Sequence, residues 1–485
     1  MQKRVSLEKT APQGWIYRAA SGKVDVGSAI VSLLTLPACF LAIWGVLQQP
    51  TEDALPYCML AGMGIALLVL FARHVQSRPY VGAAIVFSAA LILRMLFLLI
   101  WPIEPVDDFA LSYRLAQQLA VGDARAIHAA VYDPNNLYAT TWSVHMPFVL
   151  TEAGLLRLTG GGVLTLQLGF CVCGAATCLL TERIAGVLAG TRVGWCAGMM
   201  MAVNPTALYF TSVLSNQHAA LTLCLLAVWF FYARPLRSRW GNTLAAGTAL
   251  AVSNLLRPEM LVVLLAFACY GGYHALRSEG VRHKGKAFAQ CAAEILVMAA
   301  LLFGSTAAVS ALLLRADLIR EPMTKSHMNY KLAVGLNADS LGKWNPQDAE
   351  IEHNEATLKE QVRERLSHPR TVLWLAAEKI KYQFGVYDYC WSGRTDAVPG
   401  RQSMRKGLCQ SWMFMILVLF AAAAVRTAFM KRAPLLPVLV IVLGYFMVFA
   451  LIEVQDRYNY LLLPFFSAVA AWGIPEVGKR ELFRL

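Results

Sequence analysis

Residues 80–110 read YVGAAIVFSAALILRMLFLLIWPIEPVDDFA, an apolar run that ends just before two adjacent aspartates. The segment 81–101 is long enough to cross a bilayer as a helix, because about 20 apolar residues span the hydrocarbon core. Asp107 and Asp108 therefore follow the end of a predicted membrane span. Their meaning depends on the side of the membrane that they face and on the other polar residues that gather there.

The rest of the chain has the same apolar character. Its 485 residues are 57% hydrophobic and 15% charged, with a mean hydropathy of +0.51, whereas a soluble protein carries about 25% charged residues. Several further apolar runs favour one large membrane domain over a series of soluble domains. The predicted fold class is all-α: a polytopic membrane helical bundle of about twelve spans, with extracytoplasmic amphipathic helices in two long loops.

The basic residues predict the orientation of this bundle. The formal net charge is +13, but Lys and Arg are scattered over short loops, which is typical of membrane topology and excludes a nucleic-acid groove. The stretch before residue 29 is basic, the loop 48–55 is acidic and the loop 72–80 is basic. This alternation predicts that the protein lies in the cell membrane with both termini on the cytoplasmic side. The aspartate pair would then lie on the extracytoplasmic side. The basic N-terminal tail lacks a cleavage site, so we expect it to be retained.

One apolar stretch, 142–158, is not predicted to cross the membrane. If it did, four basic loops would face outward, so we expect an interfacial helix there. The remaining spans are 29–47, 56–72, 81–101, 163–188, 191–212, 214–233, 242–256, 258–275, 288–314, 410–427, 434–453 and 457–474.

The spans and loops divide the chain into four predicted regions. The first, 1–80, is a cytoplasmic tail with two extra spans. The second, 81–314, is a membrane core that contains the first outer loop, 102–162. An extracytoplasmic loop region, 315–409, follows, and residues 410–485 form the last spans and a short cytoplasmic tail.

Both long loops are predicted to contain amphipathic helices. In the first, either aspartate of the pair can cap a helix over 109–120, with Gly122 at its end. In the second, Asn345 suits the N-cap and Pro346 the first position of a helix that carries Ile351, Leu358, Val362 and Leu366 on one face. The His-Pro pair at 368–369 should end that helix.

The cysteines and the missing motifs narrow the function classes. Most of the eleven cysteines fall inside predicted spans, where they behave as small hydrophobic residues. Cys390 and Cys409 lie in the second long loop, and the sequence leaves a disulfide and two free thiols equally open. The sequence contains no C-x-x-C zinc spacing, Walker loop, G-x-S-x-G or GxGxxG motif. No metal site is predicted from spacing.

Ionisable residues gather on the predicted outer face. Besides the aspartate pair, Arg257 and Glu259 lie at an outward turn, and Arg457 opens the last span. An arginine fork binds phosphate through two hydrogen bonds, and a nearby carboxylate can take a proton from an attacking hydroxyl. The simpler interpretations are a capping aspartate, an Arg257–Glu259 pair at the membrane interface and an interfacial anchor at Arg457.

Five stretches resemble one family. PVDDFALSYRLAQQLAVG (105–122) is similar to the first-loop pattern of bacterial GT-C glycosyltransferases of the protein-mannosyltransferase type, glycosyltransferase family 39. Later segments of that family resemble HMPFVLTEAGLLRLTGG (145–161), NLLRPEMLV (254–262), NYKLAVGLNADSLGKWNPQD (329–348) and RYNYLLLPFFSAVAAWG (457–473). The motifs are short, but their order and shared outer placement cover most of the chain after the second predicted span.

The resemblance implies a reaction. A sugar would pass, with inversion, from a polyprenyl-phosphate carrier to a hydroxyl of a glycan, lipid or protein acceptor on the extracytoplasmic face. Region 81–314 would be the catalytic core. Asp108 would be the general base, favoured over Asp107 because it directly precedes the aromatic residue. The adjacent Asp107 could position the acceptor or hold a divalent cation, and a divalent cation is the one cofactor left open.

The resemblance also implies substrate-binding residues. These are Asp107, Tyr113, His145, Arg257, Glu259, Arg457 and Tyr458. The family carries Pro-Pro where this chain has His-Met-Pro, so the role of His145 is open; an interfacial histidine with satisfied hydrogen bonds is the simpler interpretation.

Two other function classes fit a similar bundle. A lipid-linked glycan ligase or polymerase shares the lipid-phosphate chemistry. A flippase or transporter of lipid-linked sugars should place charges near the bilayer midplane and show symmetric halves. Here the predicted spans hold few charges apart from cases such as Arg94 and Glu294, and the two halves differ in loop design. These features favour a sugar transferase.

Overall fold

The computed structural model describes residues 25–48, 54–75, 79–101, 103–122, 124–133, 142–277, 281–325, 327–352, 354–385, 399–430, 433–474 and 477. Every regular element in these ranges is a helix. Six of the helices are long and apolar enough to cross a membrane, which indicates a membrane protein. They are α1 (Val26–Leu47), α2 (Ala54–Val75), α3 (Pro79–Ile100), α7 (Val163–Ala189), α13 (Val281–Arg315) and α18 (Pro399–Ala428).

Shorter helices complete the bundle. Three of them are strongly apolar: α10 (Gln217–Ala233), α12 (Leu261–Leu276) and α19 (Leu436–Leu451). The others are α8 (Thr191–Ala202), α9 (Pro205–Phe210), α11 (Arg239–Leu256), the 3₁₀ helix η4 (Asp456–Leu462) and α20 (Leu463–Gly473). Most predicted spans therefore coincide with one helix each, but a count of twelve spans stays a prediction.

Two predicted spans are not single α-helices. The span 191–212 is divided between α8 and α9, because Asn204 caps α9 by accepting a hydrogen bond from the Ala207 backbone N–H (3.2 Å) and Pro205 takes the first helical position. Proline has no N–H to donate and disfavours helix in the residue before it. The span 457–474 starts as the 3₁₀ helix η4 and becomes α-helical only at Leu463.

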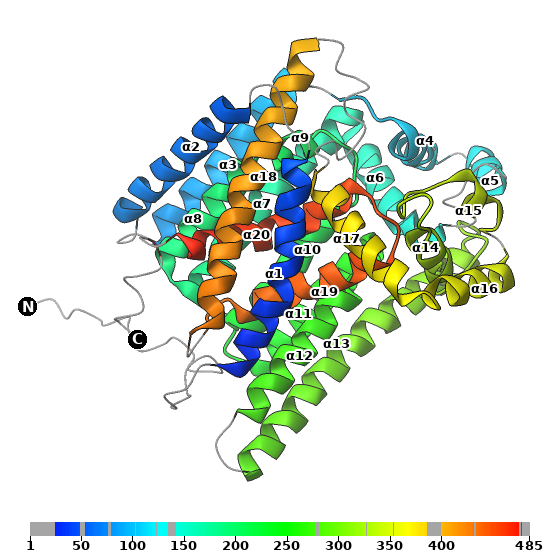
Figure 1. Ribbon diagram of the computed structural model, residues 1–485. Coiled ribbons are helices and arrows are strands. Elements are labelled where there is room, and N and C mark those ends of the chain that lie inside the picture. Colours follow the sequence, from blue (N-terminus) through cyan, green and yellow to red (C-terminus); the bar gives the residue numbers. More distant parts are fainter. Residues whose placement is uncertain are drawn as a thin grey trace, which may run out of the picture.

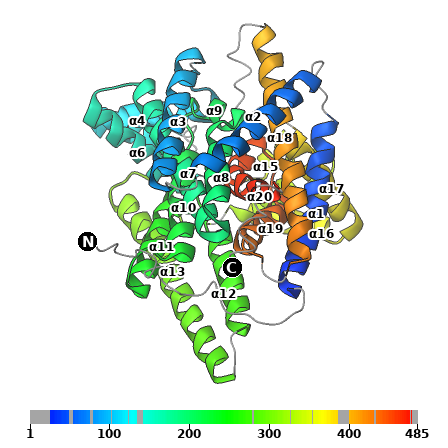
Figure 2. The same ribbon diagram turned by 90° about the vertical axis from the view of Figure 1, so that its left-hand side faces the viewer.

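The last helix lies at the centre of the bundle (Figure 1, red; Figure 2). Every residue of α20 from Leu463 to Gly473 is buried, and α20 packs against α7, α8, α18 and α19. A helix that is apolar on all sides packs either against neighbouring helices or against lipid, and the burial of every residue shows that neighbours surround α20. The central position of α20 fixes the preceding η4, which carries Arg457.

The first long loop folds into short helices. They are α4 (Asp107–Val121), α5 (Ala124–Tyr132), the 3₁₀ helix η2 (Ser143–His145) and α6 (Met146–Thr159). The end of α4 at Gly122 agrees with the prediction, since this residue has the left-handed conformation (φ 76°) that glycine adopts readily. The apolar stretch 142–158 corresponds to η2 and α6; at 14 residues α6 is shorter than a membrane span.

The second long loop also contains short helices. They are α14 (Met328–Gly335), α15 (Pro346–Glu350), α16 (Glu355–Leu366) and α17 (Pro369–Gly385). The cap at Asn345 is confirmed, because its side chain accepts from the Asp348 backbone N–H at 2.8 Å. The single helix predicted from Pro346 to 366 is wrong. A second cap, Asn354, accepts from the Thr357 N–H (3.2 Å) and starts α16 separately.

The short helices of the two loops gather on one side of the molecule, at the right in Figure 1. Leu358 and Val362 of α16 are buried against Tyr330, Ala333 and Val334 of α14, forming a small core of their own. The Cys390–Cys409 pairing lies outside the described residues at Cys390, and Cys409 itself is buried in α18. The two loops together frame the polar cluster described next.

Candidate functional site

The aspartate pair occupies the first turn of α4. The N-cap of this helix is Val106, and its carbonyl accepts from the N–H groups of Phe109 (3.0 Å) and Ala110 (3.2 Å). The prediction that Asp107 or Asp108 caps the helix is therefore wrong, because the helix starts one residue earlier than expected. Both carboxylates instead lie in the first turn of α4, beside the positive end of its dipole.

Asp108 meets an arginine from the far end of the chain. The Arg457 Nη2 lies 3.4 Å from the Asp108 Oδ2 across 349 positions of sequence. The Asp108 side chain is 55% exposed and that of Arg457 17%. Arg457 is held from behind, since its Nε donates to Gln455 Oε1 (2.7 Å) and its guanidinium lies 5.3 Å from the Phe109 ring centroid. The structure thus presents one open carboxylate beside one well-anchored guanidinium.

The second arginine, Arg257, lies between α11 and α12. Its Nη2 is 2.6 Å from Glu259 Oε1, and its Nη1 donates to Asn216 Oδ1 at 3.2 Å. Its guanidinium also lies 5.2 Å from the ring centroid of Tyr458, the neighbour of Arg457. The structure therefore places the turn with Arg257 and Glu259 against η4, and four of the residues named from the sequence share one neighbourhood.

His145 is surrounded by the positive side chains of Arg257, Lys331 and Arg457. Its Nδ1 is 3.4 Å from the Asn216 side-chain nitrogen. Burial, together with the positive charges of Arg257, Lys331 and Arg457 and the nearby His327, lowers the pKa of His145 to about 3. An imidazole in these surroundings is neutral at physiological pH.

Sequence reasoning missed Lys331. This residue of α14 forms a short ion pair with Glu453, and its ammonium lies 4.9 Å above the ring of Trp142 from the first loop. The Glu453 backbone N–H also donates to the Lys331 carbonyl at 3.0 Å. Lys331 belongs to the NYKLAVGLN stretch, but nothing in its local pattern distinguishes it from a lysine on a solvated helix face.

A buried lysine fixes the relative position of these segments. The Lys379 ammonium, on α17, donates to the carbonyl of Gly335 at the end of α14 (2.8 Å) and to that of Ala450 at the end of α19 (3.0 Å). This one nitrogen thereby satisfies a carbonyl at two helix C-termini at once. Gly342 leaves room for it, since a β-carbon there would come within 2.8 Å of the Lys379 Cδ. The segments that carry Lys331 and Arg457 are thereby joined.

Tyr113 has its contacts elsewhere on α4. Its hydroxyl accepts from Gln117 Nε2 at 3.1 Å and lies beside Gly162. On the buried face of the same helix, Ser112 donates to Glu152 Oε2 of α6 at 2.8 Å. Burial raises the pKa of the Glu152 carboxyl to about 8, although the hydrogen bond from Ser112 opposes the shift. This contact joins α4 to α6 and so orients the helix that starts with the aspartate pair.

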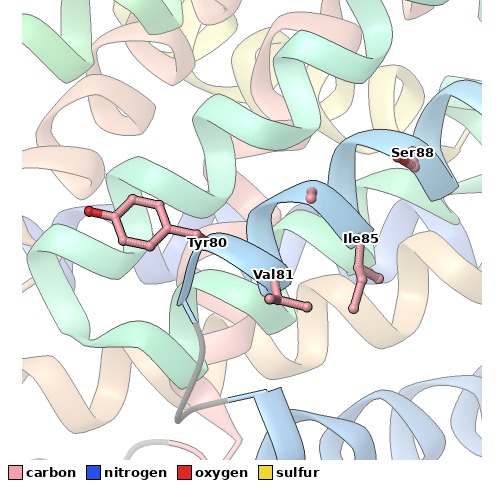
Figure 3. A pocket seen from close by; sticks show the side chains of 5 residues that line it. Tyr80, Val81, Ile85 and Ser88 are labelled. Carbon is pink, nitrogen blue, oxygen red and sulfur yellow. The ribbon is translucent and has the colours of Figure 1, made fainter.

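Other features carry less chemistry. Within the described ranges, no group of three or more His, Cys, Asp or Glu side chains could hold a metal ion. Figure 3 shows a hollow on α3 lined by Tyr80, Val81, Ala84, Ile85 and Ser88. Its lining is mainly apolar, and Asp108, Arg257, Lys331 and Arg457 take no part in it.

Comparison with known proteins gives no family. No protein-family model matches the chain, and the comparison with curated proteins finds no match.

Proposed function

We propose that the protein is a polyprenyl-phosphate-sugar-dependent glycosyltransferase with an extracytoplasmic site. The observation that carries the proposal is the half-exposed Asp108 carboxylate beside Arg457. Arg257, Lys331 and Arg457 also lie close enough to His145 to act on its charge. One carboxylate can take a proton, and several cations can hold a phosphate. The apolar helices beside them offer a path for an isoprenoid tail within the lipid.

The reaction that we infer needs one base and one anion site. Arg257 and Arg457 bind the phosphate that links the sugar to its lipid. The acceptor hydroxyl gives its proton to the Asp108 carboxylate while its oxygen attacks the anomeric carbon from the opposite face. The bond from that carbon to the phosphate oxygen breaks, and polyprenyl phosphate leaves with the electron pair. Asp108 contributes roughly 10²–10⁴-fold in rate, as general bases typically do.

The similarity of five stretches to protein-mannosyltransferase-type GT-C enzymes supports this assignment. We extend it to a bundle of about twelve spans with both termini in the cytoplasm of the cell, on the Lys/Arg distribution. The acceptor is a hydroxyl of a cell-envelope glycan, lipid or protein.

Cysteine labelling tests the orientation. The sequence suggests a probe at Asn135, which lies outside the described residues, so we choose Lys359, whose side chain is 66% exposed on α16. In a background without reactive native thiols, Lys359→Cys should react with a membrane-impermeant maleimide in intact cells. Ser238→Cys, at the exposed start of α11, should react only after lysis. The reverse pattern would contradict an extracytoplasmic site.

Two measurements test the activity. Purified protein should transfer sugar from a synthetic polyprenyl-phosphate sugar, and not from the matching nucleotide sugar, to extracted envelope glycans or lipids. Mass spectrometry of envelope glycans from cells with and without the gene should show a missing sugar in the latter. Unchanged glycans, together with no transfer from any polyprenyl-phosphate sugar, would reject the proposal.

A further inference from the structure

The side-chain amide of Asn216 has a single possible orientation. Its Oδ1 accepts from Arg257 Nη1 (3.2 Å), and its Nδ2 donates to the Leu256 carbonyl (2.9 Å). A guanidinium can only donate and a carbonyl can only accept, so the two contacts independently assign oxygen and nitrogen to the same positions. The amide therefore cannot be turned over without losing both hydrogen bonds.

This orientation determines the proton position on His145. The Asn216 Nδ2, a donor only, lies 3.4 Å from the His145 Nδ1, so Nδ1 must accept. A neutral imidazole that accepts at Nδ1 carries its proton on Nε2. Burial, together with the charges of Arg257, Lys331 and Arg457 and the nearby His327, keeps the ring neutral.

We propose that Asn216 is a positioning residue that fixes His145 as the Nε2–H tautomer, and that this N–H donates a hydrogen bond to a phosphate oxygen of the lipid-linked donor. The second half rests on the glycosyltransferase proposed above. The neutral ring adds a directional donor to a site whose cations already supply charge. A ring with so low a pKa is a weak base and carries no second proton at the working pH. His145 is therefore assigned as a hydrogen-bond donor and not as a general acid or base.

The three residues of this hydrogen-bonded arrangement lie far apart in the sequence, so only the folded chain brings them together. Asn216 lies just before α10, His145 in η2 and Arg257 after α11. The contacts of α11 with α10 and with η2 bring the three together. Each residue taken alone has a simple structural interpretation. Only the chain of hydrogen bonds from Arg257 through Asn216 to His145 shows which ring nitrogen of His145 carries the proton.

A spectroscopic experiment tests the tautomer without any activity assay. The protein has nine histidines, so ¹⁵N-histidine labelling in detergent micelles with His145→Gln as the reference identifies the His145 signals. We expect a neutral ring protonated at Nε2 throughout pH 5–8. A ring protonated at Nδ1, or an imidazolium at pH 6, would overturn the inference even if sugar transfer is found.

Asn216→Asp sharpens the same test. A carboxylate at this position accepts rather than donates, so the tautomer should switch to Nδ1–H and the pKa of His145 should rise. The activity of the variant should then fall within pH 5–8 as His145 becomes protonated, a limb of the pH–activity profile that the neutral His145 of the wild type does not produce in this range. A packing role alone would change stability but create no new limb. Asn216→Leu, which removes both polar atoms, is the matched control and should show no limb either.

The hydrogen bond from His145 Nε2–H to the phosphate is tested with two amide side chains that replace different ring nitrogens. His145→Gln places an amide N–H near the Nε2 position, whereas His145→Asn places one near Nδ1. A hydrogen bond to a charged group is worth about 1.5–3 kcal/mol, so affinity for polyprenyl-phosphate sugar should be roughly tenfold or more higher in His145→Gln than in His145→Asn. Equal affinities in two folded variants would reject the contact. Absence of lipid binding in the wild type would instead reject the function.

Discussion

The two ends of α11 carry two charge clusters of opposite design. At its start, Glu294 of α13 accepts from Arg234 (2.9 Å) and from Arg239, and its side chain is only 2% exposed. At its other end lies Arg257, in the cluster where the Asp108 carboxylate is 55% exposed. A helix of 18 residues separates the two by about 27 Å.

The difference lies in which charge is enclosed. In the Glu294 cluster two arginines surround one buried carboxylate, so the protein itself satisfies the anion. In the cluster at the other end of α11, Arg257, Lys331 and Arg457 each pair with a separate carboxylate, and the Asp108–Arg457 contact is long and open to solvent. Buried pairs cost several kcal/mol to break, whereas exposed pairs are worth about 0–1 kcal/mol. The first cluster is suited to holding helices together, and the second to exchanging its partners for a ligand.

The largest expected effect tests the structural cluster. Glu294→Ala leaves two arginines without their shared carboxylate and should lower the free energy of unfolding by about 3–5 kcal/mol. Thermal unfolding in detergent measures it. Glu321→Ala, which removes an exposed i,i+4 pair with Lys325, is the control and should cost less than about 1 kcal/mol. Equal, small losses in both variants would remove the distinction between the clusters.

The next effect tests the open carboxylate. Asp108→Asn keeps the shape but cannot take the acceptor's proton, so turnover should fall by roughly 10²-fold or more with donor binding retained. Asp107→Asn is the matched control. Asp107 has a φ of 48°, a conformation that asparagine tolerates well, so the helix should persist with most of the activity. Loss only in Asp107→Asn would exchange the roles, and loss in both would favour a shared acceptor or cation site.

The smallest effect tests the phosphate contact. Arg257→Lys keeps the charge but loses the planar fork that now contacts both Asn216 and Glu259. Affinity for the lipid-linked sugar should fall by roughly tenfold while the fold persists, because lysine cannot bind phosphate through two parallel N–H groups. Donor binding to protein in detergent measures the change. Unchanged affinity would move the phosphate to Arg457 or out of the cluster.

Local patterns were sufficient for much of the architecture. The apolar runs predict the six long helices, Gly122 predicts the end of α4, and Asn345 with Pro346 predicts the start of α15. These features depend on hydrophobic length and on hydrogen bonds between residues a few positions apart, which a sequence displays directly. Patterns of the same kind failed at Val106 and Asn354, where alternative caps a few residues away compete.

The sequence by itself determined that this is an all-helical, membrane-type chain, and it named the ionisable residues that follow its apolar runs. Only the tertiary structure decided which of them meet. Asp108 reaches Arg457 across 349 positions, and Asn216, Lys331 and Lys379 enter the cluster with no local signal. The reason is physical: a helix is specified by neighbours within a few residues, whereas the meeting of side chains depends on how buried helices such as α20 pack, and packing is a property of the whole chain.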